Sequence, residues 1–378
     1  MIQMSNTDIH PFSIDIPESD LNDLHERLDR TRWPDELPDV GWDYGVPLDY
    51  LQELVNYWRT DYDWREHEET LNEFPQYTTD IDGLEIHFLH VRSPEPDSIP
   101  LIMTHGWPGS VVEFLDVIGP LTDPRVRGGD HGDAFDLVIP SIPGYGFSGP
   151  TSETGWDVRR IASTFAKLMR RLDYNRYGAQ GGDWGSAISR ELGTVDPEHV
   201  VGVHLNYLVT VPSGDLSNLS EEDEARLAQL KRYKSEPAGY MRIQSTRPQT
   251  LAYGLTDSPV GQLAWIAEKF TEWADPARPI EVDRLLTNVM LYWLTGTAGS
   301  SARLYYESAK SRGQPKRCPV PLGVAVFPHD LVLPVRRLAE LQYTVVHWSE
   351  FDRGGHFAAM EVPDVLVTDV REFFQRFR

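Results

Sequence analysis

The strongest structural signal in the chain is Tyr177-Gly178-Ala179-Gln180-Gly181-Gly182-Asp183-Trp184-Gly185-Ser186. A strand pattern leads into this stretch and a helix pattern leads out of it. Asp183 lies two residues after Gly181 and two residues before Gly185. Glycines at these flanks permit a turn so tight that a side chain there would clash, and the central residue takes a strained conformation. The sequence therefore predicts a carboxylate on a sharp strand-to-helix turn.

This spacing is that of the nucleophile elbow, with Asp183 where ester hydrolases carry Ser. The helix that follows points its positive end at the carboxylate. An aspartate is ionised at neutral pH without a neighbouring base, and it suits displacement at a strained or activated sp3 carbon. The product is an alkyl ester of the enzyme, which water must then hydrolyse. An Asp that caps a helix after a glycine turn gives the same local pattern, so neighbouring motifs decide between the two interpretations.

Strand and helix patterns alternate along most of the chain. A hairpin pattern covers residues 77–91. Further strand patterns, with helix patterns between them at 158–172 and 186–192, cover 99–104, 135–140, 176–179, 200–207, 322–327 and 343–348. Alternating strands and helices predict a mostly parallel central sheet flanked by helices, an α/β fold. Such sheets bind ligands beyond the carboxyl ends of their strands.

Two parts of the chain have helix patterns only. Leu21, Leu24 and Leu28 fall at helical spacing behind a predicted cap at Ser19, and a second helix pattern covers 51–58. Strand patterns also stop after Pro212, where helix patterns follow a capping box at 220–223 and recur at 263–273 and 285–294. We therefore expect an N-terminal helical extension (1–76), an α/β core (77–211 and 310–378) and an inserted helical lid (212–309).

A second motif, His105-Gly106-Trp107-Pro108-Gly109-Ser110, directly follows the strand pattern at 99–104. In α/β-hydrolases this loop supplies one backbone N–H of the oxyanion hole, and the residue after the nucleophile supplies the other. We expect Trp107 and Trp184 to fill these roles.

Two motifs near the C-terminus supply a base and an acid. A glycine turn holds His356 after the last strand pattern, and Phe327-Pro328-His329-Asp330 ends the strand before it. Asp330 can orient His356 and stabilise its protonated form, as the third member of a triad does. The order nucleophile, acid, histidine is that of the α/β-hydrolase fold. Three other acids lie on the strand or loop of the histidine itself and are less able to reach the ring: Glu350, Asp352 and Glu361.

Taken together, these motifs resemble those of the epoxide hydrolase family. The chain is most similar to the branch of microsomal and insect juvenile-hormone members, which carries an extra N-terminal helical region. The resemblance spans essentially the whole chain, although the membrane anchor of the microsomal members is missing. It implies an α/β-hydrolase fold and conversion of an epoxide to a vicinal diol, with no metal and no organic cofactor.

The resemblance also implies two lid tyrosines that grip the epoxide oxygen. Gly239-Tyr240-Met241 matches the first, and Arg303-Leu304-Tyr305-Tyr306-Glu307 matches the second. Tyr305 fits the motif because it lies two residues before the Glu, while Tyr306 stays open because of the doubled tyrosine. Asp183 would then attack an epoxide carbon while Tyr240 and Tyr305 donate hydrogen bonds to the departing oxygen.

His356, held by Asp330, would activate the water that hydrolyses the resulting ester. Trp107 and Trp184 would stabilise its oxyanion and line the substrate site.

Composition limits the partners. Lys and Arg total 35 against 58 Asp and Glu, a net charge of −23, which disfavours nucleic acid without a concentrated basic patch. Cys318 is the one cysteine, so no intramolecular disulfide or thiolate metal cluster can form. Residues 1–11 are polar, and no run reaches the roughly 18–20 apolar residues of a spanning helix. We expect a cytoplasmic protein that takes a small apolar or aromatic epoxide and water, without nucleic acid or membrane; a homodimer is left open.

Two alternative functions remain compatible with the sequence. A haloalkane dehalogenase shares the Asp nucleophile and the following Trp, but it does not need the pair Tyr240 and Tyr305. A non-catalytic, ligand-binding protein of the same fold is the second. An esterase is disfavoured because no Gly-x-Ser-x-Gly occurs. Detoxification and secondary metabolism both fit the sequence, and regiochemistry and stereochemistry are not encoded in these motifs.

Overall fold

The central element is one twisted sheet. A computed structural model describes residues 8–127, 131–213, 216, 219–235, 238–311 and 317–378. In these residues nine strands pair in the order β1-β2-β3-β5-β4-β6-β7-β8-β9, antiparallel from β1 to β5 and parallel from there on. The predicted mostly parallel sheet is confirmed. The strands are β1 (His10–Phe12), β2 (Gln76–Ile81), β3 (Leu84–Val91), β4 (Ile99–Thr104), β5 (Phe135–Pro140), β6 (Tyr177–Gly181), β7 (Val200–Leu205), β8 (Leu322–Val326) and β9 (Val345–Glu350).

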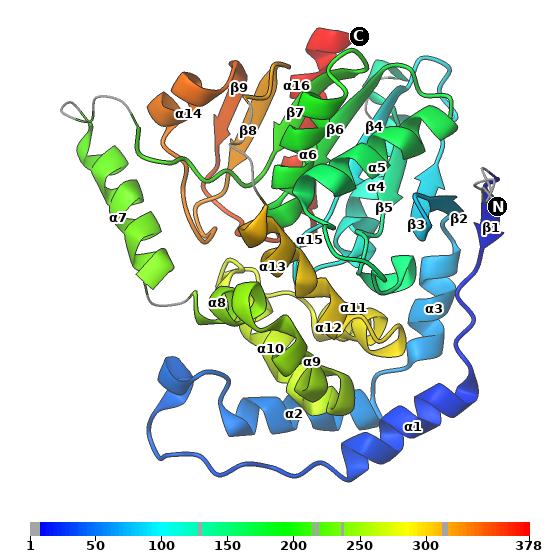
Figure 1. The fold of residues 1–378 in the computed structure, drawn as a ribbon, viewed down its shortest axis with the longest axis vertical. Coiled ribbons are helices and arrows are strands. Elements are labelled where there is room, and N and C mark those ends of the chain that lie inside the picture. The colour runs from blue at the N-terminus through cyan, green and yellow to red at the C-terminus, as the bar shows by residue number, and fades with distance from the viewer. Residues whose placement is uncertain (1–7, 128–130, 214–215, 217–218, 236–237, 312–316) are drawn as a thin grey trace.

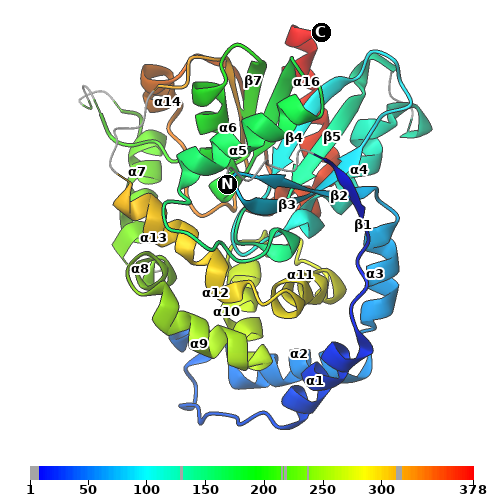
Figure 2. The same ribbon diagram turned by 45° about the vertical axis from the view of Figure 1, so that its right-hand side comes forward.

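Helices cover both faces of the sheet (Figures 1 and 2). Helix α5 buries Ile161, Phe165 and Leu168 completely at helical spacing, and each such side chain contributes about 1.5–3 kcal/mol on burial. This apolar stripe holds α5 against its neighbours, and α6 follows the elbow on the same face. The core helices are α4 (Leu115–Thr122), α5 (Val158–Arg171), α6 (Asp183–Val195), α14 (Arg336–Gln342), α15 (Ala358–Glu361) and α16 (Pro363–Phe374).

A block of helices lies between β7 and β8 in the chain, and most of it gathers at the carboxyl ends of the parallel strands (Figure 1). Ser220 caps the first helix, because its Oγ accepts a hydrogen bond from the Asp223 N–H at 3.1 Å; the predicted cap is confirmed. The helices are α7 (Glu221–Ser235), α8 (Gly239–Thr246), α9 (Pro248–Asp257), α10 (Pro259–Glu272), α11 (Val282–Leu294), α12 (Ala298–Ser301) and α13 (Arg303–Lys310).

The N-terminal helices pack on this block rather than on the sheet (Figure 2). The Tyr57 hydroxyl donates to the Asp283 carboxylate at 2.8 Å, and the Tyr62 and Thr287 hydroxyls lie 3.1 Å apart. The predicted cap at Ser19 is wrong, because the first helix already begins at Glu18. These helices are α1 (Glu18–Asp29), α2 (Leu48–Thr60) and α3 (Trp64–Asn72). Within the described residues, no helix has the length and apolar character needed to cross a membrane.

Candidate active site

Asp183 is the first residue of α6 and has a positive φ of 46°, a backbone conformation that non-glycine residues rarely adopt. The flanking glycines make the turn possible. A Cβ added at Gly181 would lie 2.4 Å from the Gly185 carbonyl oxygen, and one added at Gly185 would lie 1.8 Å from the Thr104 carbonyl oxygen. Since no side chain fits at either place, both positions require glycine, and the carboxylate stands out at the end of β6.

The two carboxylate oxygens of Asp183 have different surroundings. The Trp107 N–H donates to Oδ1 at 2.8 Å. The next residue, Trp184, lies in the first turn of α6, where backbone N–H groups have no intrahelical acceptor. The second oxygen, Oδ2, lies 3.6 Å from Nε2 of His356. One oxygen is therefore held by backbone while the other faces the imidazole.

The loop that carries Trp107 is fixed from the core by His105. The Ile142 N–H donates to Nε2 of this ring at 3.2 Å, so Nδ1 carries the proton and donates to the Gly106 carbonyl oxygen at 2.9 Å. Burial lowers the pKa of His105 to about 4, which keeps the ring neutral. We therefore assign His105 to the shape of the loop rather than to proton transfer.

Helix α11 of the lid fixes the same loop from the other side. Asn288 donates to the Pro108 carbonyl oxygen at 2.7 Å, and the Tyr292 hydroxyl donates to the Gly109 carbonyl oxygen at 2.6 Å. Sequence reasoning missed both residues because they stand inside an ordinary amphipathic helix.

His356 and Asp330 are brought together as expected from their motifs. Nδ1 of His356 lies 2.7 Å from Oδ1 of Asp330, and both side chains are buried. The Leu331 N–H donates to the same Oδ1 at 2.7 Å. The backbone N–H of His356 donates to the Trp273 carbonyl oxygen at 2.9 Å. The imidazole is thereby oriented with Nε2 towards Asp183.

Charge determines the protonation of this pair. Burial lowers the pKa of His356, but the charges of Asp330 and Asp183 and the hydrogen bond to Asp330 outweigh burial and raise it to about 10. Burial also raises the pKa of Asp330, against the opposing effect of His356. The resting site therefore holds a protonated imidazole between two carboxylates.

The other acids considered for the triad have partners elsewhere. Glu350 accepts from Arg226 and from the Trp348 indole N–H, Glu361 accepts from the backbone N–H groups of Asp275 and Phe357, and Asp352 is exposed.

Tyr240 and Tyr305 are buried above the elbow. The Tyr240 ring stacks on Trp107 with centroids 5.1 Å apart, and the Tyr305 ring stands edge-on to Trp184 at 4.7 Å. The two tyrosine rings are 6.0 Å apart. Tyr306 lies beside the Lys310 ammonium instead, 5.5 Å from the ring centroid. The geometry thus favours Tyr305 over Tyr306 as a group that faces Asp183.

Both tyrosines stay protonated. Burial raises the pKa of Tyr240 and of Tyr305 well above the usual value, and the negative charge of Asp183 adds to the effect. A phenol in this state offers one hydroxyl proton to a ligand oxygen.

Two further side chains lie at the site: Trp273, one of the tryptophans that the sequence suggests for an aromatic pocket, and Glu113, which sequence reasoning missed. Trp273 stands edge-on to His356 at 5.1 Å and is tilted against Tyr240 at 5.3 Å, so its ring forms one wall of the site beside His356. Burial raises the pKa of Glu113 to about 8, which leaves this carboxyl mostly neutral near pH 7. Neither residue carried a motif in the sequence.

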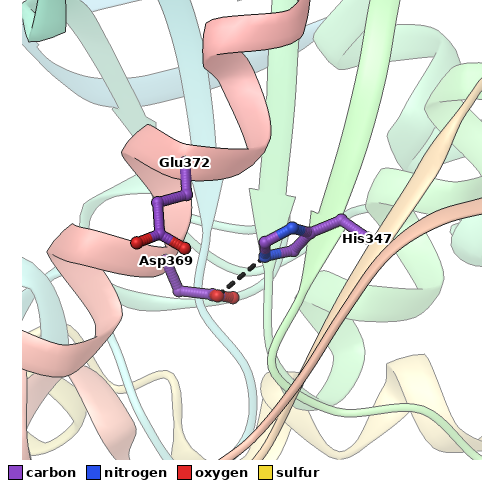
Figure 3. Close-up of side chains that lie close together, drawn as sticks. All are labelled: His347, Asp369 and Glu372. Atoms are coloured by element: carbon purple, nitrogen blue, oxygen red, sulfur yellow. Dashed lines mark hydrogen bonds and ion pairs between the residues drawn. The ribbon is translucent and has the colours of Figure 1, made fainter.

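Of the described residues, one group has the geometry for a metal ion: His347, Asp369 and Glu372 place ligand atoms within 4.8 Å of one another (Figure 3). It lies on β9 and α16, away from Asp183. Asp369 already accepts from His347 at 2.7 Å and from His204 at 2.8 Å, and the guanidinium of Arg376 lies 3.4 Å from Nδ1 of His347. The positive charge of the guanidinium disfavours a metal cation at this place. We therefore assign His347, Asp369 and Glu372 to the packing of α16 on the sheet.

A cavity of about 970 Å³ lies between α1, the segment 30–48 and the start of α10. None of Asp183, His356 and Tyr240 lines it, so its size does not mark the place of the chemistry.

Comparisons with known proteins agree with the geometry. Residues 9–114 match the family model described as the epoxide hydrolase N terminus, and residues 99–268 match the alpha/beta hydrolase fold model. The chain is 48% identical to a putative epoxide hydrolase of Stigmatella aurantiaca (strain DW4/3-1), over 98% of this chain and 86% of that protein. It is 38% identical to epoxide hydrolase 1 of Sus scrofa, over 97% and 88% of the two chains.

Solved structures give the same result. The juvenile hormone epoxide hydrolase of the silkworm Bombyx mori superposes with a TM-score of 0.91 at 34% identity, over 100% of this chain and 96% of that one. The epoxide hydrolase of Aspergillus niger superposes with a TM-score of 0.88 at 32% identity, over 98% and 97%.

Proposed function

The chain belongs to the epoxide hydrolase family and hydrolyses epoxides, and on this premise we propose that Asp183 is its nucleophile and forms an alkyl ester with the substrate. One observation carries the proposal: Oδ1 of Asp183 is held by the Trp107 N–H while Oδ2 faces the His356–Asp330 pair. Oδ2 is the oxygen that attacks, because its lone pairs are not engaged by backbone.

Ring opening needs an acid opposite the nucleophile. Tyr240 and Tyr305 donate hydrogen bonds to the epoxide oxygen as the C–O bond breaks and negative charge develops on it. Their buried hydroxyls are protonated, and the rings of Trp107 and Trp184 hold them above Asp183.

Ester hydrolysis uses the His356–Asp330 pair beside the same carboxyl group. Once Asp183 is esterified its charge is gone, which lowers the pKa of His356. The proton that the ring loses neutralises the alkoxide formed by ring opening, and the neutral ring can then take a proton from water. The water attacks the ester carbonyl carbon. The oxyanion then forms on Oδ1, where the Trp107 N–H already donates and the Trp184 N–H adjoins. As it collapses, the bond between the carboxyl carbon and Oδ2 breaks, and the diol leaves with Oδ2 and a proton from His356.

The aromatic walls support a small apolar or aromatic epoxide as substrate. Trp107, Trp273 and Tyr240 contact one another around the nucleophile, and such surfaces bind apolar groups. We further propose that residues 212–309 form the lid and that 77–211 and 310–378 form the catalytic core. Within 1–76, helices α1 to α3 brace the lid, while β1 and Gln76 belong to the sheet.

One turnover in heavy-oxygen water tests the ester directly. With enzyme in excess over styrene oxide, we expect the first diol to carry unlabelled oxygen from Asp183 and the solvent label to enter that carboxylate. Mass spectrometry of the diol and of the peptide containing Asp183 gives the result. Enzyme kept in the same water without epoxide is the control and stays unlabelled. Label in the diol of the first turnover, with an unlabelled protein, would rule out the ester.

Removing both lid hydroxyls should stop ring opening. For the double variant Tyr240→Phe, Tyr305→Phe we expect ester formation to slow by more than the about 10²–10³-fold typical of one lost donor. Tyr306→Phe is the matched control and should keep wild-type rates, because its ring lies beside Lys310. Rapid-quench measurement of the ester reports the rate. Full activity of the double variant on epoxides would instead favour dehalogenase-type chemistry, which chloroalkane turnover would reveal.

A further inference from the structure

A third buried tyrosine contacts the lid pair. The hydroxyl oxygen of Tyr233, on α7, lies 2.7 Å from the hydroxyl oxygen of Tyr240. Both side chains are buried, at 7% and 5% exposure, so this hydrogen bond is shielded from water. Tyr233 carries none of the sequence motifs of the site.

The direction of this hydrogen bond matters for catalysis. A phenol has one hydrogen to donate and two lone pairs that accept. If Tyr240 donated to Tyr233, its only proton would point away from the epoxide. If Tyr233 donates, the proton of Tyr240 is free for the substrate, and the accepted hydrogen bond polarises the Tyr240 O–H and strengthens its own donation. We propose that Tyr233 is a positioning residue for ring opening, which donates to Tyr240 and directs the Tyr240 proton at the epoxide oxygen.

The Tyr240 ring itself is fixed by other groups. It stacks on Trp107 with an interplanar angle of 10°, and the Lys269 ammonium lies 5.0 Å from its centroid. With the ring held in place, the remaining freedom is the rotation of the hydroxyl proton. Tyr233 is the group placed to restrict that rotation.

Helix α7 holds Tyr233 in turn. Among the residues of α7 whose burial is described, Arg226, Leu230 and Tyr233 are buried, at spacings of four and three, so one face of α7 points inward. Along this face Arg226 donates to the Pro334 carbonyl oxygen at 2.8 Å, and Gln229 accepts from the Leu333 N–H at 3.3 Å. These contacts join α7 to the segment that begins at Asp330. They therefore fix the position of the Tyr233 hydroxyl relative to the side chains of the triad.

Tyr233 also has the right protonation state. Burial raises its pKa above the usual value and outweighs the lowering effect of the hydrogen bond with Tyr240, and the negative charges of Asp183 and Asp330 add to the rise. The phenol therefore keeps the proton that it has to donate.

The inference rests on the proposed role of Tyr240, and the Tyr233→Phe variant tests it. The variant removes one oxygen and keeps the ring, so packing is preserved. With styrene oxide as probe, we expect ester formation to slow about tenfold, the effect of one lost hydrogen bond, and ester hydrolysis to keep its rate. Tyr253→Phe is the matched control, since Tyr253 is 71% exposed. Equal slowing of both steps would indicate a purely structural role and overturn the proposal.

A double-mutant cycle separates the role of Tyr233 from the role of Tyr240 itself. If Tyr233 acts through Tyr240, Tyr233→Phe costs nothing further once Tyr240 is already Phe. An equal loss in both backgrounds would overturn the inference about Tyr233 alone. A Tyr240→Phe variant with wild-type ester formation would instead defeat the proposed lid chemistry. Ring-substituted styrene oxides give a second readout, because the substituent changes the basicity of the departing alkoxide. Tyr233→Phe should slow ester formation most for the epoxides whose alkoxide is most basic.

Discussion

Asp183→Asn should abolish diol formation, with kcat lower by about 10⁴-fold or more, as for the loss of a nucleophile elsewhere. Asparagine is nearly isosteric and tolerates the positive φ of 46° at this position. Its amide oxygen can still accept the Trp107 N–H. The fold and the oxyanion hole therefore survive, while the anionic oxygen that attacks carbon is gone.

The chain offers a matched control for this variant. Asp173 also has a positive φ, 63°, and is exposed on the surface. Asp173→Asn should keep wild-type activity, which separates the loss of the nucleophile from the loss of an aspartate in a left-handed turn. Initial rates of diol release and the melting temperature of both variants give the measurement. Sustained release from Asp183→Asn would contradict the nucleophile assignment at its first step.

His356→Gln should trap the enzyme as its ester. Ring opening needs no base, so one equivalent of ester forms; hydrolysis then slows by about 10³–10⁴-fold, as for loss of a general base. The intact mass of the protein should rise by the mass of the epoxide and stay there. The matched control is His329→Gln, because His329 is 44% exposed. Continuous turnover, or a protein that never gains mass, would be inconsistent with the two-step scheme.

The same residue predicts the pH dependence of the wild-type enzyme. The His356 pKa of about 10 is raised by Asp330 and Asp183 against the lowering effect of burial, and esterification removes the charge of Asp183. The ring is protonated below its pKa and cannot accept a proton from water. Ester hydrolysis should therefore slow as the pH falls through the pKa of His356 in the ester, and that pKa should lie below the value in the free enzyme. Ester decay followed at several pH values, with the imidazole titrated by NMR, checks both points.

Local patterns predicted much of the fold. The strands β4 and β5 have the predicted bounds, and the helix pattern at 158–172 corresponds to α5 within one residue. These elements combine β-branched or amphipathic runs with clear breaks, so the period of the pattern specifies them. The three-residue strand β1 was not predicted, because its exposed side chains give no alternation. Helix α3 was missed as well, since its nine residues hold few apolar positions.

The candidate site likewise contains features that the local sequence predicts and features that it does not. The glycine spacing around Asp183 marks the elbow in the sequence without any knowledge of the fold, although the contact that requires Gly185 is made with Thr104 on β4. The chain order of Asp183, Asp330 and His356 in their strand-end motifs likewise predicts which side chains should meet, because the carboxyl ends of parallel strands share one edge of the sheet.

Packing between distant segments decided the rest. The hydrogen bond of Tyr233 to Tyr240, the donors Asn288 and Tyr292 on the Trp107 loop, and the Trp273 carbonyl behind His356 all join lid helices to one another or to the core. A helical residue points at a neighbour only once the crossing of its helix is set, and that crossing depends on the whole core. The amino-acid sequence therefore predicted the residue that we propose as nucleophile and its chemistry, and only the tertiary structure specified the groups that hold its partners in place.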